Sequence, residues 1–256
     1  MLLARSARSG ARRSFFVERL SLAAADHYER AVVAQRYPQR IILVRHGESE
    51  ANIDLTLHES KPDAHMALTA RGWEQARALG ARLRAEERAR GEGGGGVQFL
   101  VSSYRRTRET LSGVLDGGDW PSRELAPVIE EPRLREQEFG MYQDARAIAA
   151  TMEARRRIGA FYFRFPDGES GADVHDRVHD LVEDLHRLFR RPAWRARGGM
   201  RPKTVVIVTH GLTARLFLMK WFRLSVLQVS GGPRATATRS SRRLIVFTYD
   251  LSLIQI

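Results

Sequence analysis

The feature that most constrains this chain is a pair of apolar segments that each lead to a histidine followed by glycine. Residues 41–44 (IILV) precede Arg45 and His46, and residues 204–208 (TVVIV) end shortly before His210. Both segments are apolar without alternation, which is typical of strands in a parallel sheet that are buried on both faces. Ligands of such α/β sheets bind beyond the carboxyl ends of the strands. We therefore expect the two histidines to open into one pocket.

A third apolar segment, residues 97–101 (VQFLV), is followed by a basic stretch with the character of a helix start. Arg106 would lie near the first turn of this helix, where free backbone N–H groups and the helix dipole favour an anion. Arg45 stands beside the first histidine, and the planar fork of an arginine suits a phosphate. A solvated surface is the simpler interpretation of Arg105 and Arg108. Together these segments predict an anion-binding pocket.

These segments, with a charged stretch further along the chain, resemble the histidine phosphatase superfamily, also called the phosphoglycerate mutase-like family. The resemblance covers residues 39–223 and depends on these matches: Arg45-His46-Gly47-Glu48-Ser49, Asn52, and residues 68–76, 103–110, 133–140 (RLREQEFG), 165–170 (FPDGES) and 208–211 (VTHG). The amino-acid sequence of residues 161–170 and 217–221 further resembles that of the small phosphoglycerate-mutase-like phosphatases of plants and fungi. The resemblance implies an α/β fold of three layers, with a mostly parallel central sheet and helices on both faces.

Carried over position by position, the resemblance assigns roles to six residues. It makes His46 the nucleophile that accepts the phosphoryl group and Glu136 the proton donor to the leaving oxygen. The remaining four would surround the phosphate oxygens: Arg45, Arg106, His210 and, as a minor ligand, Asn52. Fixed positive groups and in-line positioning are what phosphoryl transfer requires. The resemblance implies neither a metal nor a cofactor.

These roles make demands on three pKa values. His46 must be neutral to attack, whereas His210 works best protonated, so we expect their pKa values to be separated, with a bound phosphate raising that of His210. Glu136 must keep its proton, which requires burial or a nearby anion to raise its pKa. Glu138 is the neighbour that could be confused with it. The spacing to Phe139 favours Glu136, and we expect Glu138 on the surface.

Composition excludes several kinds of site. The 256-residue chain has no cysteine, which excludes disulfides, thiolate catalysis and cysteine metal sites. No apolar run approaches the roughly 20 residues of a membrane helix. His175 and His179 lie four apart on a predicted helix over residues 173–189. Their charged neighbours indicate a solvated face opposite an apolar stripe rather than a metal site.

The net charge of +12 is unevenly distributed along the chain. Residues 1–40 and 190–256 carry +5 and +12, whereas residues 41–189 sum to −5. The basic excess therefore belongs to the two ends, and the preference for arginine over lysine fits a compositional bias of the genome. Both observations disfavour a nucleic-acid partner. A small phosphorylated substrate is the expected partner, and the sequence predicts no oligomeric state.

We predict three parts of the chain. Residues 1–38 form a basic extension, whose first 16 residues contain four arginines, three serines and no acid. That composition is typical of a transit peptide for a mitochondrion or plastid. A disordered arm on a cytoplasmic protein is the alternative. Residues 39–224 form the phosphatase domain, and residues 225–256 diverge from the family pattern, although residues 244–249 have the β-propensity of a last strand.

Local signals predict further elements and boundaries. Helices are expected over residues 19–36, 69–90 and 213–222. Glycine-containing loops are expected at residues 91–96 and 116–119, and a basic linker at residues 192–202.

Three functions fit the sequence. The first is a metal-independent phosphatase that hydrolyses a small phosphorylated metabolite through a phosphohistidine. A phosphoglycerate mutase would use the same histidine but must retain a bisphosphate intermediate, which requires further basic groups; residues 155–157 (RRR) are candidates. A nonenzymatic phosphate-binding regulatory protein would keep the pocket without turnover. Retention of all four matched pocket groups argues against this third function.

Overall fold

The computed structural model describes residues 37–90, 96–140, 145–195, 199–230, 243–247 and 253–255. Its strands are β1 (Arg40–Arg45), β2 (Gly96–Val101), β3 (Ile129–Glu130), β4 (Pro202–Thr209), β5 (Arg243–Phe247) and β6 (Leu253–Gln255). Its α-helices are α2 (Glu50–Ile53), α3 (Ala70–Ala89), α4 (Arg105–Gly118), α5 (Ala145–Ile158), α6 (Gly171–Arg190), α7 (Gly211–Phe222) and α8 (Val226–Ser230), and its 3-10 turns are η1 (Leu55–Glu59), η2 (Asp63–His65), η3 (Ser122–Glu124) and η4 (Pro132–Leu134). The predicted transit peptide, the helix over residues 19–36 and nearly all of the glycine-rich loop lie outside the described residues.

The strands form one sheet in the order β3-β2-β4-β1-β5-β6. All neighbouring pairs are parallel except β5 with β6, which are antiparallel. Arg45 lies opposite Thr209 in the register of β1 and β4. The backbone N–H of His46 donates to the carbonyl oxygen of Thr209 at 2.9 Å. His46 and His210 therefore leave the sheet side by side at the same edge, as the sequence predicted.

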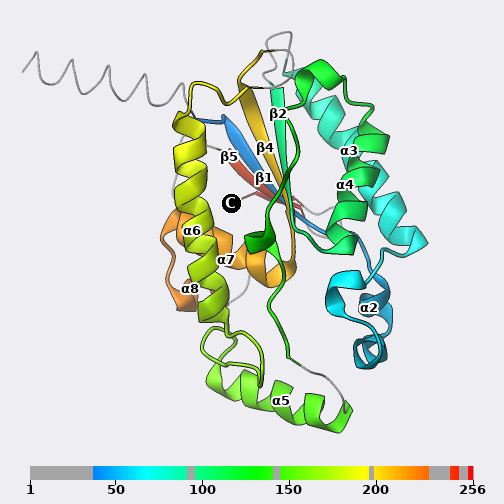
Figure 1. The fold of residues 1–256 in the computed structure, drawn as a ribbon, viewed down its shortest axis with the longest axis vertical. Coiled ribbons are helices and arrows are strands. Elements are labelled where there is room, and N and C mark those ends of the chain that lie inside the picture. The colour runs from blue at the N-terminus through cyan, green and yellow to red at the C-terminus, as the bar shows by residue number, and fades with distance from the viewer. Residues whose placement is uncertain are drawn as a thin grey trace, which may run out of the picture. The chain divides into compact units, whose positions relative to one another are not determined.

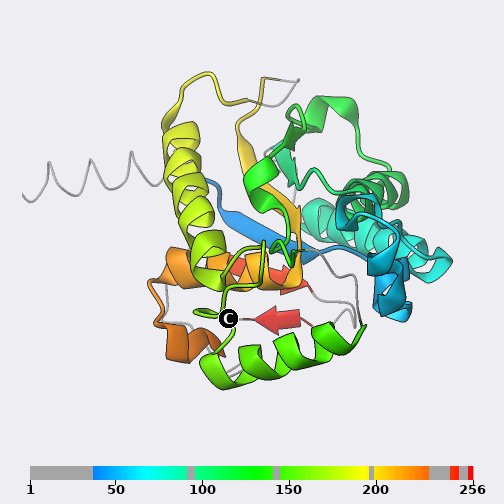
Figure 2. The same cartoon turned by 60° about the horizontal axis from the view of Figure 1, so that its bottom comes forward.

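Helices cover both faces of the sheet, with α3 and α4 on one side and α6 and α7 on the other (Figures 1 and 2). The core under α3 and α4 combines apolar helix positions with alternate residues of the central strands: Ile42, Val44, Leu79, Leu83, Val97, Phe99, Val101, Leu111, Val114, Val206 and Val208. The intervening strand residues, among them Leu43 and Ile207, are also fully buried. Since successive strand residues point to opposite faces, both faces are covered, and the three-layer α/β prediction is confirmed.

Helix α6 shows why the local sequence folds as it does. Its N-cap Ser170 accepts a hydrogen bond from the backbone N–H of Asp173, and the Asp173 carboxylate accepts one from the backbone of Ser170. This reciprocal cap satisfies backbone N–H groups that have no hydrogen-bond partner within the first turn of a helix. Val174, Val178 and other apolar residues of α6 are buried, as the predicted apolar stripe requires.

The loop predicted at residues 116–119 is wrong in its position. Helix α4 continues through Gly118 and ends at Asp119, which has a positive φ of 43°. The glycine there allows close helix packing instead of a turn. A Cβ on Gly117 would lie 2.1 Å from the carbonyl oxygen of Arg77 in α3, so only glycine fits at this approach. The same contact type recurs at Gly80, where a Cβ would lie 2.2 Å from a carbonyl oxygen of α4.

The predicted last strand is present as β5, which pairs in parallel with β1. Helix α7 begins directly after His210. Among the described residues, no helix combines the length and apolar character that crossing a bilayer requires.

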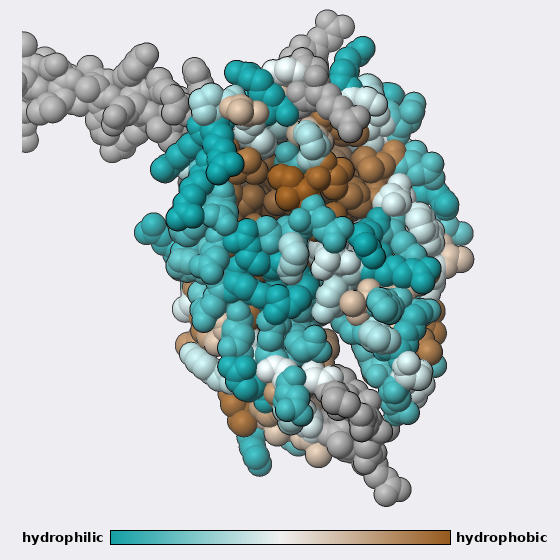
Figure 3. Space-filling view, in the orientation of Figure 1, coloured by the Kyte–Doolittle hydropathy of each residue, from teal (hydrophilic) through white to brown (hydrophobic). Residues whose placement is uncertain are grey.

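On the face seen in Figure 3, apolar side chains gather over the upper parts of β2 and β4, away from the strand ends that carry the histidines.

Candidate active site

His46 lies directly after β1 with only 4% of its surface exposed. Its Nδ1 is 2.8 Å from the carbonyl oxygen of Gly47. Because a carbonyl oxygen only accepts hydrogen bonds, Nδ1 carries the proton and Nε2 keeps a lone pair. Arg106 Nε donates to that Nε2 at 3.2 Å. Burial, followed by the positive charge of Arg106, lowers the pKa of His46 well below its usual value. The imidazole is therefore neutral, with Nε2 as its basic atom.

His210 follows β4 and is fully buried. Its ring centroid lies 5.1 Å from that of His46. Ser102 Oγ is 2.9 Å from His210 Nε2, whereas Nδ1 of His210 is buried without a hydrogen-bond partner among the described residues. Burial, followed by the charge of Arg106, also lowers the pKa of His210 well below its usual value. Both rings are desolvated beside the same guanidinium, so both pKa values are shifted in the same direction, and the expected separation of the two values stays a prediction.

Arg106 lies in the first turn of α4, as predicted, and is almost completely buried. Besides contacting His46, its guanidinium pairs with Asp63, whose Oδ1 and Oδ2 lie 2.9 and 3.0 Å from Nη1 and Nη2. The guanidinium carbon also lies 5.0 Å from the ring centroid of Tyr104. The Tyr104 ring in turn contacts the ring of His210 edge-on. Arg106 is therefore a fixed charge between the two histidines and an acidic residue.

The other two predicted phosphate ligands differ in their surroundings. Arg45, the last residue of β1, has a charge that contributes to lowering the pKa of both His46 and His210. Asn52 is exposed, and its carbonyl oxygen accepts hydrogen bonds from the backbone N–H and hydroxyl of Ser49 at 3.0 and 2.8 Å. The role of Asn52 as a phosphate ligand stays a prediction.

Glu136 lies in the loop after η4, within electrostatic reach of Arg106, Arg45 and Asp63. Burial is the main cause that raises the pKa of its carboxyl, and the negative charge of Asp63 acts in the same direction. Thr213 Oγ1 lies 3.4 Å from the Glu136 carboxyl. This environment favours the protonated acid, which the predicted role of a proton donor requires.

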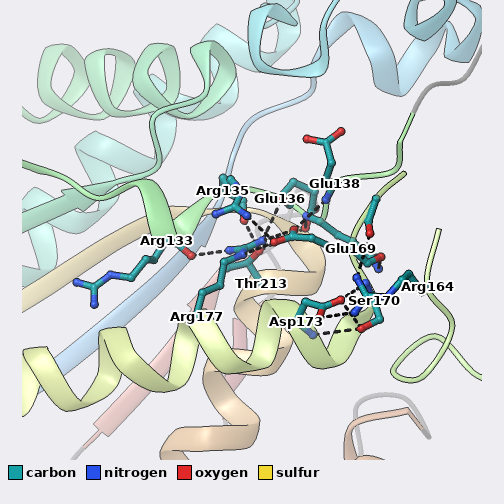
Figure 4. A network of polar contacts seen from close by, with 12 residues as sticks. Arg133, Arg135, Glu136, Glu138, Arg164, Glu169, Ser170, Asp173, Arg177 and Thr213 are labelled. Carbon is teal, nitrogen blue, oxygen red and sulfur yellow. Dashed lines mark hydrogen bonds and ion pairs between the residues drawn. The ribbon is translucent and has the colours of Figure 1, made fainter. Parts of the chain in front are cut away.

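A network of ion pairs holds the loop that carries Glu136 (Figure 4). Arg177 of α6 donates to the backbone carbonyl oxygens of Arg133 and Glu136 at 2.5 and 3.0 Å. It also pairs with Glu169, with Nε to Oε1 at 3.1 Å. The backbone N–H of Glu138 donates to Glu169 Oε2 at 3.0 Å, and the side chain of Glu138 is exposed, as predicted. The proton-donor loop is thus fixed from α6.

Five residues that surround the predicted site received no role from the sequence: Asp63, Ser102, Tyr104, Glu169 and Arg177. Ser102 and Tyr104 lie one and three residues after the end of β2, so the rule that ligands bind at strand ends could have found them. Asp63 carried no such signal.

The histidines of α6 do not form a metal site within the described part of the chain, where no group of three or more metal-ligating side chains occurs. His179 Nε2 lies 3.2 Å from the ammonium nitrogen of Lys220, and the His175 ring packs against Phe161. A neighbouring ammonium disfavours a second cation. Both rings are half-buried, because α7 and the loop before α6 pack beside them, so this part of the predicted solvated face is less exposed than its charged neighbours indicate.

A family model for the histidine phosphatase superfamily (branch 1) matches residues 41–240. The chain belongs to the histidine phosphatase superfamily. Phosphoglycerate mutase-like protein AT74 of Arabidopsis thaliana is 44% identical over 209 residues, covering 76% of this chain and 61% of that protein. The chain therefore spans less than two thirds of that relative. The broad-range acid phosphatase DET1 of Saccharomyces cerevisiae is 32% identical over 269 residues, covering 73% of this chain and 79% of that protein.

Solved structures of histidine phosphatases share the fold. A mycobacterial glucosyl-3-phosphoglycerate phosphatase with VO3 aligns with a TM-score of 0.54 at 22% identity, over 74% of this chain and 84% of that one. An α-ribazole phosphatase from Shigella flexneri aligns with a TM-score of 0.53 at 23% identity, over 73% and 82% of the two chains. At this identity the likeness supports the fold, while the chemistry has to come from the residues of the pocket.

Proposed function

We propose that this histidine phosphatase is a metal-independent enzyme that hydrolyses a small phosphorylated metabolite through a phosphohistidine at His46. The observation that carries the proposal is the state of that imidazole. Its Nδ1–H donates to Gly47, its Nε2 lone pair faces the guanidinium of Arg106, and its pKa is lowered so that the ring is neutral. A neutral imidazole with a directed lone pair beside a fixed cation is the arrangement that attack on an anionic phosphorus requires.

The reaction then follows in two balanced steps. His46 Nε2 attacks phosphorus, the bond to the leaving oxygen breaks, and that oxygen takes the proton of Glu136. In the second step, the Glu136 carboxylate takes a proton from water while the water oxygen attacks the phosphohistidine. The phosphorus–nitrogen bond breaks, which restores neutral His46 and protonated Glu136. The raised pKa of Glu136 supports this role, since the group must hold a proton at the start of each cycle.

Charge on the phosphoryl oxygens would be stabilised by groups of the chain itself. Arg45 and Arg106 are permanently positive. His210 presents a buried Nδ1 without a partner among the described residues, and a bound phosphate would raise its pKa toward the protonated form. Two guanidiniums and an imidazolium supply the positive charge that metal ions supply in other phosphatases.

The phosphatase is favoured over the mutase by the surroundings of the basic residues on α5. Arg155 lies over the ring of Phe165, with 5.8 Å from its guanidinium carbon to the centroid, and Arg156 pairs with Glu153. These residues are engaged with local neighbours, whereas a mutase needs further cations to retain a bisphosphate. Dependence of turnover on added 2,3-bisphosphoglycerate would instead identify a mutase, and steady release of inorganic phosphate without it identifies the phosphatase.

Chelation is expected to leave activity unchanged. Because protein cations would stabilise the phosphoryl group, EDTA should not alter the initial rate of phosphate release from a monoester such as p-nitrophenyl phosphate. Vanadate, which imitates the transferring group, should inhibit competitively. Loss of activity in EDTA that returns on adding a divalent ion would contradict this assignment of the site.

Replacing Arg106 with alanine is expected to raise KM and also lower kcat. The guanidinium contacts the phosphate position in the ground state and in the transition state, so both parameters should change. Loss of one such preorganised donor typically costs about 10²- to 10³-fold in kcat. Steady-state kinetics on p-nitrophenyl phosphate measure both effects. Exposed Arg108, on the same helix, offers the matched control: Arg108→Ala should retain wild-type kinetics.

A further inference from the structure

Asp63 determines which edge of the Arg106 guanidinium faces the nucleophile. Arg106 Nη1 donates to the backbone carbonyl oxygen of Asp63 at 2.7 Å and to its Oδ1 at 2.9 Å, and Nη2 donates to Oδ2 at 3.0 Å. Arg106 Nε donates to His46 Nε2 at 3.2 Å. The side chains of Arg106 and Asp63 are 5% and 20% exposed, so solvent screens this pair poorly.

These hydrogen bonds fix the orientation of the Arg106 guanidinium, because its five N–H groups lie in one rigid plane. The bonds to Asp63 use both hydrogens of Nη1 and one hydrogen of Nη2. The remaining Nη2–H lies on the same edge as Nε–H, and Nε–H points to His46. That edge can bind two oxygens of a phosphoryl group, whereas the edge that carries Nη1 is occupied by a carboxylate.

Asp63 is itself held against the helix that carries Arg106. The carbonyl oxygen of Asp63 also accepts from the backbone N–H of Met66, whose side chain is completely buried. Two residues later, the backbone N–H of Leu68 donates to Glu109 Oε2 of α4 at 2.7 Å. The stretch from Asp63 to Leu68 is therefore attached to α4 through both Arg106 and Glu109. An acid fixed in this way can hold a neighbouring side chain in one orientation.

We propose that Asp63 is a positioning residue for phosphoryl transfer. It holds Arg106 so that the edge formed by Nε and Nη2 receives the phosphoryl group on its way to His46. The proposal rests on the proposed phosphatase function and adds a residue that acts through Arg106. The Asp63 carboxylate also offsets part of the positive charge of the pocket, so removing this carboxylate should strengthen the binding of a phosphate anion while it impairs turnover.

The test compares Asp63→Ala and Asp63→Asn with wild type, on p-nitrophenyl phosphate for kcat and KM and on inorganic phosphate for Ki. We expect Asp63→Ala to lower kcat about 10- to 100-fold, the order of loss that a misplaced catalytic contact causes. The Ki for phosphate should stay the same or fall. Asp63→Asn keeps one oxygen acceptor for the guanidinium and should lie between alanine and wild type. The unchanged or lower Ki contrasts with the weaker binding, seen as a raised KM, that is expected for Arg106→Ala.

Two controls separate positioning from a general structural effect. Asp54 accepts a hydrogen bond from the backbone N–H of Thr56 at 2.9 Å and is the N-cap of η1, the turn that precedes η2 in the chain. Asp54→Ala should lower the melting temperature without changing kcat or KM. In an Arg106→Ala background, Asp63→Ala should cause little further loss, because a residue that acts through Arg106 has nothing left to position.

The outcomes are distinct. A fall in kcat with unchanged or tighter phosphate binding, absent in the Arg106→Ala background, supports the positioning role. Full additivity of the two substitutions, or a raised Ki with unchanged kcat, overturns it while leaving the phosphatase intact. Absence of any hydrolysis by the wild-type protein would instead overturn the proposed function itself.

Discussion

His46→Ala is expected to abolish hydrolysis, with a loss in kcat of about 10⁴-fold or more, the size seen when a covalent nucleophile is removed. The reason is that Nε2, the atom that Arg106 contacts, would form the bond to phosphorus, and no other group would accept the phosphoryl group in the proposed mechanism. Residual phosphate binding should persist, because the arginines remain. Turnover of p-nitrophenyl phosphate and the Ki of phosphate measure the two properties separately.

The same variant tests the intermediate. Wild-type protein incubated with labelled substrate and quenched without acid should carry label that is stable to alkali and released by acid, and His46→Ala should carry none. His65, exposed on the neighbouring η2 turn, provides a histidine control, since His65→Ala should label normally.

The buried His46 ring also accepts a hydrogen bond from Arg106, so His46→Ala should cost about 1–3 kcal/mol of unfolding free energy. Undiminished turnover in a folded His46→Ala protein would end the phosphohistidine mechanism.

The parts of the site that were predictable from the sequence are those attached to the ends of regular elements. His46 and His210 follow apolar strands, and parallel pairing brings such ends together without any knowledge of the side chains. Arg106 was predictable for a related reason, since a helix start after a strand faces the same edge. In each case a local pattern fixes the backbone, and the backbone alone decides where the side chain lies.

Asp63 could not be placed from a local pattern, because a tertiary contact positions it. Asp63 precedes Arg106 by 43 residues and lies in a short 3-10 turn, which is too short to show a repeating hydrophobic pattern in the sequence. Arg177 did carry a signal, since it lies between the buried Val174 and Val178 of α6 and three residues after the first of them. A charged residue bordering an apolar stripe predicts a buried ion pair, which the structure places at Glu169.

The pKa values also depended on tertiary structure. The sequence predicted separated pKa values for the two histidines, with a bound phosphate raising that of His210, and the structure adds that desolvation and Arg106 lower the pKa of both rings. A group whose pKa falls on burial is neutral over most of the pH range, so protonation of His210 requires the negative charge of a bound phosphate. In the proposed mechanism, the anion that reacts would therefore also create part of the charge that stabilises it.

Glu136→Gln is expected to lower kcat for alkyl phosphates by about 10²- to 10⁴-fold with little change in KM, the range typical of general acid catalysis. A proton donor acts only as the leaving oxygen departs, so the loss belongs to the transition state. The loss should be small for p-nitrophenyl phosphate, whose phenolate leaves without a proton. Glycerol phosphate and p-nitrophenyl phosphate, assayed side by side, measure the difference. Exposed Glu138 is the matched control, and Glu138→Gln should retain wild-type rates with both substrates.

The pH dependence of the same variant gives an independent readout. The pKa of Glu136 is raised by burial, so the carboxyl holds its proton to a higher pH than an ordinary glutamate and loses it as the pH rises through that raised value. For an alkyl phosphate, wild-type kcat should therefore fall on the alkaline side, and Glu136→Gln should lack that fall because an amide does not titrate in this range. If Glu136→Gln slowed alkyl and aryl phosphates equally and kept the alkaline fall, Glu136 would position the substrate, and the proton would have to come from another group.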